Sequence, residues 1–350
     1  MARDGDQDAF GRLVEPHRAS LHAHCYRMMG SVHDADDALQ DSLLRAWRGL
    51  RRFEGRSALS TWLHQIATNV CLDALARRPN RVLPIDYGPP TGPHDHGQRL
   101  DESVWVEPYP DAQLGLHNGH ISPEARYELR ESIELAFIAA LQHLPARQRA
   151  VLILRDVLAF SSREVAEALE TTTASVNSAL QRARKTMDDR LPACSQQATL
   201  DSVGDAGVRD LVNSFVDAFE RGDVQGILDL LTEDVTFAMP PCAGWCRGRD
   251  AVAESWLMPE GPTPRLRYQL TWANAQPAVA AYLLDPETDD YVPIALDVLT
   301  LSGRQIAAVT AFRSPGLFAR FGLPDRLPRD ADPDRWPQDH PQSSGPAAQQ

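Results

Sequence analysis

The sequence predicts a multidomain protein in which two all-helical domains precede an α+β domain of helices packed on a curved antiparallel sheet. Two observations predict the helical domains, because apolar residues recur at spacings of three or four over residues 1–82 and again over 129–192. A third observation predicts the last domain, since apolar and polar residues alternate over 265–272. At 350 residues the chain is long enough for several cores.

Capping signals mark the helix boundaries of the first region. Gly30 ends one helix, and Ser31 with Asp34 resembles a capping box that opens the next. This next helix carries an apolar stripe and a separate acidic face. A third helix is predicted over residues 60–78. Its outward face is predicted to carry His64, Gln65, Thr68 and Asn69.

The second region predicts a helix-turn-helix. Ser161 with Glu164 forms a capping box for a short helix that ends near Leu169, and Thr172 can cap the helix that follows. Two helices joined by a turn of three or four residues are typical of this motif. The second helix is predicted to expose Ser175, Asn177, Ser178, Gln181, Arg182, Arg184 and Lys185.

Two breaks and a tail lie outside these patterns. Residues 83–128 are dense in Pro, Gly, His and Asp, and we predict a flexible acidic linker there. A shorter linker is predicted over 193–205 and a disordered tail over 326–350. The α+β domain is therefore predicted over 206–325. Its helices are predicted at 207–221, 224–231 and near 250–258.

Charge is distributed unevenly along the chain. The net charge is −13, yet residues 1–81 carry +2 and residues 130–192 carry +1. The remaining segments are acidic, with −6 over 82–129 and −10 over 193–350. Because phosphate binding depends on locally clustered cations, we expect nucleic-acid contacts only in the two helical regions.

Composition also bears on the redox state and the compartment. Five cysteines, an odd number and sparse for the length, favour free thiols over a disulfide framework. Cys242 and Cys246 are a close pair without a nearby histidine, so no metal site is predicted. No apolar run reaches the roughly 20 residues of a membrane helix, and the N-terminus is acidic where a signal peptide is basic. We therefore predict a cytoplasmic protein with no membrane contact and no cofactor.

The three regions resemble parts of a known family. The first resembles region 2 of extracytoplasmic-function (ECF) sigma-70 family sigma factors in DADDALQDSLLRAWRGLRRF and RSALSTWLHQIATNVCLDALARR. The second resembles their region 4 in LQHLPARQRAVLILRDVLAFSSREVAEALETTTASVNSALQRARKTM. The third resembles SnoaL-like domains, cone-shaped α+β folds. The loop PPCAGWCRGRD and the stretch AVTAFRSPGLFARFGLP are similar to the subgroup with a C-terminal SnoaL-like domain that includes SigG/SigJ-type factors.

This resemblance implies a promoter-recognition subunit that binds promoter DNA and core RNA polymerase, the latter through the beta-prime clamp and the beta flap. Glu170 stands where many relatives have a glycine in the helix-turn-helix. The contact with the clamp would use Asp37, Gln40, Asp41, Leu44 and Trp47. The minus-ten element would contact Arg56, Ser57, Ser60, Thr61, Trp62, His64, Gln65, Asn69, Arg77 and Arg78, with Arg81 as a further phosphate contact.

Two of these assignments carry a chemical argument. Trp62 suits stacking on an exposed base as well as packing in the core, and both interpretations stay open. The minus-thirty-five element would be read in the major groove by the seven exposed residues of the second helix of the helix-turn-helix. Among them Asn177 and Gln181 suit adenine edges, whereas Arg182 or Arg184 suits guanine or phosphate.

The resemblance also predicts that the third domain regulates sigma activity in cis. Trp245 and Arg247 are the candidate regulatory contact, and the alternative is that Trp245 only closes the cone. A small-molecule ligand in the SnoaL-like cone stays open. Catalysis is not predicted, because no histidine lies between His143 and His340 and Asp297 is the single carboxylate that suits an acid/base role.

Two other functions fit parts of the chain. A one-component transcription regulator would bind an operator with the helix-turn-helix and sense a ligand in the cone, but it leaves the first region without a function. A SnoaL-type enzyme would leave both DNA-binding motifs unexplained.

Overall fold

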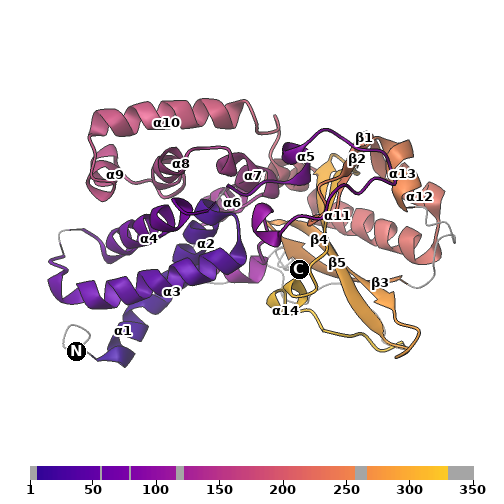
Figure 1. The fold of residues 1–350 in the computed structure, drawn as a ribbon, viewed down its shortest axis with the longest axis horizontal. Helices are drawn as coiled ribbons and strands as arrows, with labels where there is room; N and C mark the ends of the chain where they lie inside the picture. Colours follow the sequence, from indigo (N-terminus) through magenta and orange to yellow (C-terminus); the bar gives the residue numbers. More distant parts are fainter. Residues whose placement is uncertain (1–5, 56, 79, 116–121, 257–265, 330–350) are drawn as a thin grey trace, which may run out of the picture. The chain divides into compact units, whose positions relative to one another are not determined.

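The computed structural model describes residues 6–55, 57–78, 80–115, 122–256 and 266–329, which fall into two compact units. Within the described residues the helical unit comprises 6–82, 113–115 and 122–192, and the sheet unit comprises 83–112 and 193–329 (Figure 1). None of the helices in these ranges is both long and apolar enough to span a membrane.

The first half of the helical unit is a bundle, here called the N-terminal bundle (residues 6–82). It contains α1 (Gln7–Val14), α2 (Arg18–Met29), α3 (Val32–Gly49) and α4 (Leu59–Leu75), of which the last three pack against one another (Figure 1). Gly30 ends α2 in the left-handed conformation at φ 70°, and the Ser31 hydroxyl accepts the Asp34 N–H at the start of α3. Both predicted helix boundaries are therefore confirmed.

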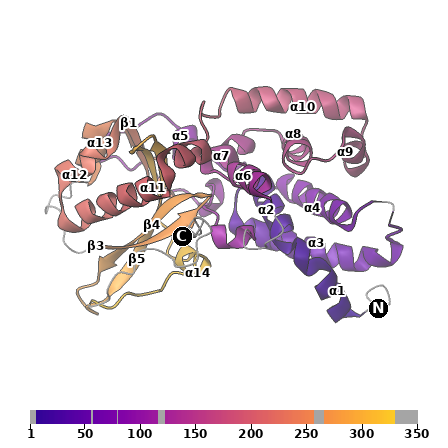
Figure 2. The same cartoon turned by 180° about the vertical axis from the view of Figure 1, so that it is seen from behind.

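The second half, here called the HTH domain (residues 122–192), has the predicted helix-turn-helix. Its helices are α6 (Pro123–Glu131), α7 (Leu135–Gln142), α8 (Ala146–Leu152), α9 (Ser162–Ala168) and α10 (Thr173–Asp188). The capping box of Ser161 and Glu164 opens α9, and the Thr172 hydroxyl caps α10. Helix α7 contacts α2, and α8 contacts both α2 and α4 (Figure 2).

The sheet unit is built on a six-stranded mixed sheet, whereas the sequence predicted an antiparallel one. The strands are β1 (Leu231–Ala238), β2 (Trp245–Arg247), β3 (Leu266–Ala273), β4 (Gln276–Leu284), β5 (Tyr291–Ser302) and β6 (Gln305–Phe312), in the order β2-β1-β6-β5-β4-β3. All neighbours are antiparallel except β1 and β6. These two strands are far apart in sequence, so no hairpin fixes their relative direction. The three-residue β2 is too short to show alternation.

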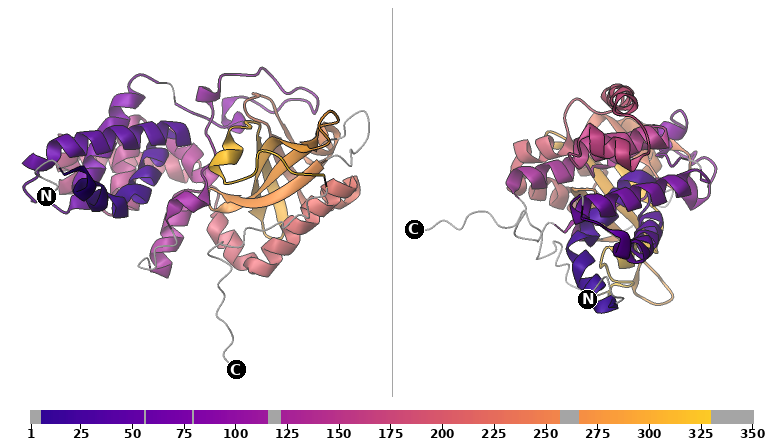
Figure 3. Two further views of the ribbon diagram at one scale, coloured as in Figure 1. Left: turned by 90° about the horizontal axis from the view of Figure 1, so that it is seen from below. Right: turned by 90° about the vertical axis from the view of Figure 1, so that its left-hand side faces the viewer.

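Both faces of this sheet are covered. The helices α11 (Gln196–Arg221), α12 (Val224–Asp229) and α13 (Arg249–Trp256) share one apolar core with the inward-facing residues of the strands. The short α14 (Leu317–Arg320) packs on the other face, where the rings of Phe318 and Tyr282 meet edge to face at 5.1 Å (Figure 3, left).

The predicted linker over 193–205 is mostly helix. Residues from Gln196 onward form the first part of α11, which bends at Gly204, a residue in the left-handed region at φ 74°. The side-chain amide of Gln196 donates to the Leu301 carbonyl at 2.9 Å and accepts the Leu301 N–H at 2.8 Å. These two hydrogen bonds pair the start of α11 with the edge of β5, a tertiary interaction that a polar composition does not reveal.

The first part of the other predicted linker is ordered as well, and we call residues 83–112 the connector. It begins with α5 (Pro84–Tyr87), and its Trp105 and Tyr109 are buried in the sheet unit. The Trp105 indole donates to the Pro241 carbonyl at 3.1 Å, and the Tyr109 N–H donates to the Asn274 side chain at 2.8 Å. The prediction of flexibility is wrong for this stretch, because two aromatic anchors outweigh its Pro- and Gly-rich composition.

The rest of that predicted linker and the predicted tail are described only in part. Residues 116–121 lie outside the described residues, and α6 occupies most of the positions from 122 to 128. In the tail, Leu327 pairs with Tyr291 by backbone hydrogen bonds and Arg329 lies 2.7 Å from Asp289. Residues 330–350 lie outside the described residues.

The turn of the helix-turn-helix gives a stability prediction. Glu170 has φ 49°, in the left-handed region that glycine adopts without a steric cost. We expect Glu170→Gly to raise the opening free energy of α9 and α10 by up to about 1 kcal/mol, measured by hydrogen exchange on the full chain. Glu167→Gly, inside α9, is the matched control and should lower the opening free energy by about 1 kcal/mol. A loss of stability in both variants would contradict this account.

Candidate nucleic-acid interface

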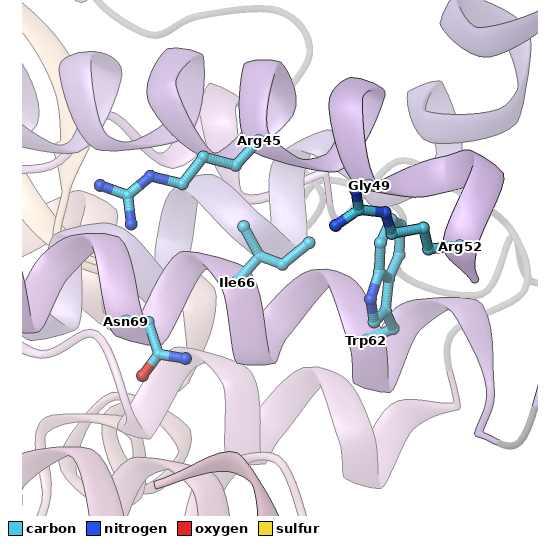
Figure 4. A pocket seen from close by; sticks show the side chains of 6 residues that line it. All are labelled: Arg45, Gly49, Arg52, Trp62, Ile66 and Asn69. Atoms are coloured by element: carbon cyan, nitrogen blue, oxygen red, sulfur yellow. The ribbon is translucent and has the colours of Figure 1, made fainter. Parts of the chain in front are cut away.

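A pocket opens between α3 and α4 in the N-terminal bundle. It has a volume of about 340 Å³ and is shown in Figure 4. Figure 4 shows the guanidinium of Arg52 beside the indole of Trp62, whereas Arg45 lies along α3 and Asn69 points away from α3. Arg45 Nη1 lies 3.0 Å from the Asp73 carboxylate. The residues that line it are Arg45, Gly49, Arg52, Trp62, Ile66 and Asn69.

Trp62 forms the flat wall of this pocket. Its ring lies 4.8 Å from the ring of Phe53, and it is only partly buried. A Cβ atom at Gly49 would lie 3.1 Å from the indole, so the absence of a side chain there makes room for the ring. An aromatic face beside a guanidinium group is a combination that can stack a nucleobase and hold its phosphate. Trp62 therefore packs on one side and remains available for stacking on the other.

Of the described residues predicted for the minus-ten element, only Trp62 and Asn69 line the pocket. The prediction missed Arg45, Arg52 and Ile66, because they lie outside the predicted outward face of α4. Arg56 lies outside the described residues. Asn69, Arg77 and Arg78 are exposed, Ser57, Ser60, Trp62 and Gln65 are partly exposed, and Thr61 and His64 are buried.

The burial of His64 corrects the predicted outward face of α4. Its side chain is 4% exposed, with Nδ1 at 2.8 Å from the Ser60 carbonyl and Nε2 at 3.2 Å from the Ser20 hydroxyl. Thr68 is fully buried and its hydroxyl lies 2.9 Å from Nε2 of His24. Internal partners satisfy these polar groups, so a polar residue type did not imply an exposed position.

Two arginines after α4 are tied to Asp34 at the start of α3. Arg81 is 7% exposed and its Nη2 lies 2.8 Å from the Asp34 carboxylate, which also pairs with Arg78. The prediction of Arg81 as a phosphate contact is therefore wrong for this structure, because a buried guanidinium is not accessible to DNA. Arg78 keeps 49% of its side chain exposed. Arg77 is exposed as predicted.

The outward face of α10 is polar and exposed. All seven residues predicted there are exposed in the structure. Arg184 forms a bidentate ion pair with Asp156, at 2.7 and 2.9 Å, and the Asn177 side chain accepts a hydrogen bond from the Ser162 hydroxyl at 2.8 Å. These contacts fix α10 against the preceding turns. The same face carries five more residues whose described side-chain hydrogen bonds, where there are any, stay within α10 and its cap. They are Ser175, Ser178, Gln181, Arg182 and Lys185.

A second hollow, between α1 and α3, borders the predicted polymerase-binding residues. It has a volume of about 530 Å³ and is lined in part by Gln40, Leu44 and Trp47. Asp37, Gln40 and Asp41 are exposed, and Leu44 keeps 46% of its surface in solvent. The ring of Phe10 covers one edge of Trp47 at 5.1 Å. An exposed leucine among carboxylates is a surface suited to a basic protein partner.

Known protein families match three separate parts of the chain. Three family models match it: sigma-70 region 2 over residues 13–81, sigma-70 region 4 over 134–187 and a SnoaL-like domain over 212–311. The chain is 42% identical over 328 residues to the ECF RNA polymerase sigma factor SigG of Mycobacterium tuberculosis, covering 93% of this chain and 86% of SigG. The chain belongs to the ECF RNA polymerase sigma factors.

Two further sigma factors resemble this one, one in sequence and one in fold. The ECF sigma factor SigW of Bacillus subtilis is 28% identical over 192 residues, which is 55% of this chain and 93% of SigW. The crystal structure of SigJ, an extracytoplasmic-function sigma factor of Mycobacterium tuberculosis, has a TM-score of 0.54 and 22% identity over 88% of this chain and 97% of its own. The latter similarity concerns the fold alone.

The predicted regulatory loop of this sigma factor holds the connector. Trp245 is 7% exposed, and its indole donates to the Gly88 carbonyl at 2.8 Å while its own carbonyl accepts the Thr91 N–H at 2.7 Å. Arg247 is exposed and lies 3.8 Å from Asp234. Trp245 is therefore an internal anchor for the connector within the sheet unit.

Asp297 lies on the core-facing side of β5, together with Ala295 and Leu299. Its Oδ1 atom is buried without a hydrogen-bond partner. Burial raises the pKa of this carboxyl to about 7, against the opposing charge of Arg313. The aromatic rings of Phe215, Phe219 and Trp256 pack edge to face in the same core, at 4.8 to 6.3 Å. Among the described residues no cluster of three metal-ligating side chains occurs.

The buried histidines of the N-terminal bundle give a pH prediction. Burial lowers the pKa of His64 from 6.5 to about 4 and that of His24 well below its usual value, and the charge of Arg27 lowers both further. Below pH 6.5 the unfolded chain therefore binds protons that the folded bundle does not. The opening free energy of α2 and α4 should fall as the pH drops from 6.5 to 4, on the order of 3 kcal/mol for His64 alone.

Hydrogen exchange of the α2 and α4 amides, corrected for intrinsic rates, measures this dependence. His64→Gln removes one titrating group and should flatten the profile, even if it lowers stability overall. His96→Gln, at an exposed position in the connector, is the control and should leave the profile unchanged. An identical slope in the wild type and in His64→Gln would contradict the assignment.

Proposed function

We propose that this sigma factor binds core RNA polymerase through the exposed face of α3 and directs initiation by reading two promoter elements, one with each half of the helical unit. The observation that carries the proposal is the match of sigma-70 regions 2 and 4 to these two halves, joined with 42% identity to an ECF sigma factor over most of the chain. Acting with the polymerase, the protein works in the cytoplasm.

The proposed promoter contacts follow from the chemistry of the two surfaces. The pocket beside Trp62 takes a base that has left the stack, with Arg45 and Arg52 placed to hold the neighbouring phosphates. The exposed face of α10 enters the major groove, where Gln181 suits an adenine edge and Arg182 a guanine. Asp37, Gln40, Asp41, Leu44 and Trp47 form the polymerase-binding face.

The SnoaL-like domain modulates this activity in cis by holding the connector between the two sigma regions. Support comes from the anchors of the connector, which are Trp105 on Pro241, Tyr109 on Asn274, and Gly88 and Thr91 on Trp245. Gly97 approaches so closely that a Cβ atom on it would lie 2.6 Å from the backbone nitrogen of Gly244. A connector held along its length cannot extend freely, which restricts how far the two sigma regions separate.

The domain acts by binding and not by catalysis. Support comes from the sequence, which has no histidine between His143 and His340 to share acid/base work with Asp297.

Binding to core polymerase tests the first part of the proposal. We expect the wild-type chain with purified core polymerase to give promoter-specific run-off transcripts from a library of promoter fragments. Leu44→Asp should weaken core binding at least tenfold and abolish the transcripts, because it places a charge in the centre of the polymerase-binding face. Leu283→Asp, at a leucine 37% exposed in the sheet unit, is the matched control and should behave as the wild type. Wild-type core binding by Leu44→Asp would rule out this face.

Release of the connector tests the second part. Trp105→Ala removes a buried ring and its hydrogen bond to Pro241, so we expect faster hydrogen exchange over residues 100–112. Transcription should change in the same direction as in a chain that ends at Ala193. Ile85→Ala, at an exposed connector position, should change neither quantity. Faster exchange with unaltered transcription would refute modulation through the connector.

A further inference from the structure

We propose that Arg184 and Asn177 are positioning residues that clamp helix α10 in place, so that other exposed residues of this helix read the promoter. The clamp consists of two contacts, Arg184 with Asp156 and Asn177 with Ser162. This division of roles rests on the proposed entry of α10 into the major groove. It separates the residues that hold the helix from those that contact bases.

The exposed side chains of α10 do not all point in the same direction. An α-helix turns about 100° per residue, so each side chain has a fixed direction relative to the buried face. That face consists of Val176, Leu180, Ala183 and Met187. Asn177 and Arg184 lie roughly 70 to 90° from its middle, on the same flank. The outermost positions, roughly 130 to 170° from the middle, belong to Ser178, Gln181, Arg182 and Lys185.

The first contact of the clamp joins Arg184 to Asp156. The Nη2 and Nε atoms of Arg184 donate to the two carboxylate oxygens at 2.7 and 2.9 Å, which is the geometry of a bidentate pair. Asp156 lies in a π-helical turn (Ile153–Val157) that follows α8, and such turns are frequent at functional sites. The pair occupies one edge of the guanidinium and neutralises the charge that a phosphate contact would use. Arg184 is therefore held for positioning.

The second contact joins Asn177 to Ser162, the first residue of α9. The Ser162 hydroxyl donates to Oδ1 of Asn177 at 2.8 Å. A bidentate contact with an adenine edge uses both the oxygen and the nitrogen of the amide. Because Ser162 already holds the oxygen, the amide is turned toward α9. The geometry therefore favours a positioning role for Asn177 over the adenine contact expected from the sequence.

The two contacts act together on the orientation of α10. Asn177 and Arg184 are seven residues apart, so the contacts lie roughly 10 Å apart along the helix axis. Two attachment points on one flank fix both the rotation of α10 about its axis and its tilt against α9. A recognition side chain must point within about 10 to 20° of its productive direction. Exposed ion pairs add little to stability, so the clamp bears on specificity.

The outermost residues form the reading face. They are spaced by three and four residues and therefore share one side of the helix. Nη1 of Arg182 donates to the Ser178 hydroxyl at 2.7 Å, one turn earlier on α10, so its guanidinium lies along this face. Gln181 and Lys185 are exposed beside it. Two cations, an amide and a hydroxyl are groups that contact base edges and phosphates.

DNA binding by the full chain in complex with core polymerase tests the clamp. The probes are a promoter fragment that the wild-type complex transcribes and the same fragment with its upstream element scrambled. Asp156→Ala and Arg184→Ala should each lower the ratio of the two affinities at least fivefold, and the double variant should lower it no further. If Arg184 contacted DNA directly, Asp156→Ala would release a cation for that contact. An unchanged or increased ratio in Asp156→Ala therefore overturns the proposal.

The charge-swapped pair, Asp156→Arg with Arg184→Asp, keeps the net charge and should restore the ratio to within twofold of the wild type. No recovery in a swapped chain with wild-type helical circular dichroism overturns the proposal. If the swapped chain does not fold, the response of Asp156→Ala decides. A wild-type complex that binds both fragments equally contradicts the proposed function, and the clamp with it.

Salt dependence separates positioning from phosphate contact. Arg182→Ala removes a cation from the reading face and should lower the slope of log affinity against log salt by about 1. Arg184→Ala should leave that slope unchanged, and a slope lowered as in Arg182→Ala overturns its positioning role. Ser162→Ala should lower the affinity ratio at least twofold, whereas Ser162→Thr keeps the hydroxyl and should resemble the wild type. An unchanged ratio in Ser162→Ala overturns the second contact of the clamp.

Discussion

The buried guanidinium of Arg149 is the interaction on which the arrangement of the helical unit depends. It binds carbonyl and amide oxygens at the end of α2, in the turn between α7 and α8 and after α4, so one side chain joins both halves of the unit. Burial lowers its pKa to about 10, which leaves the charge in place at neutral pH. This joint ties the HTH domain to the N-terminal bundle.

We propose that the SnoaL-like domain acts on the two DNA-reading surfaces through the connector. Within the helical unit, the pocket beside Trp62 and the outward face of α10 are accessible. Within the sheet unit, the SnoaL-like fold serves as a support for the connector, whose aromatic anchors fill sites next to Pro241 and Asn274. A fold that includes enzymes holds a peptide segment here.

Periodicity and capping predicted the helices that carry the promoter contacts. The signals around Ser31, Ser161 and Thr172 are local, and the structure confirms each of them. The predictions failed where a distant residue decides the outcome. Arg81 has a buried carboxylate partner, and the connector has a docking surface formed more than 130 residues later in the chain. Polar composition alone does not reveal such partners.

The candidate site shows the same limit. Trp62 and Asn69 could be chosen from the resemblance, but Arg45 and Arg52 join them only through the packing of α3 on α4. The parallel pairing of β1 with β6 likewise depends on a crossover that no local pattern encodes.

The most direct test of the account is a structure of this sigma factor bound to core polymerase and promoter DNA. The account predicts that an unstacked base occupies the pocket beside Trp62 and that the exposed face of α10 lies in the major groove. A promoter-bound complex in which the pocket holds no base and α10 lies outside the major groove would contradict it.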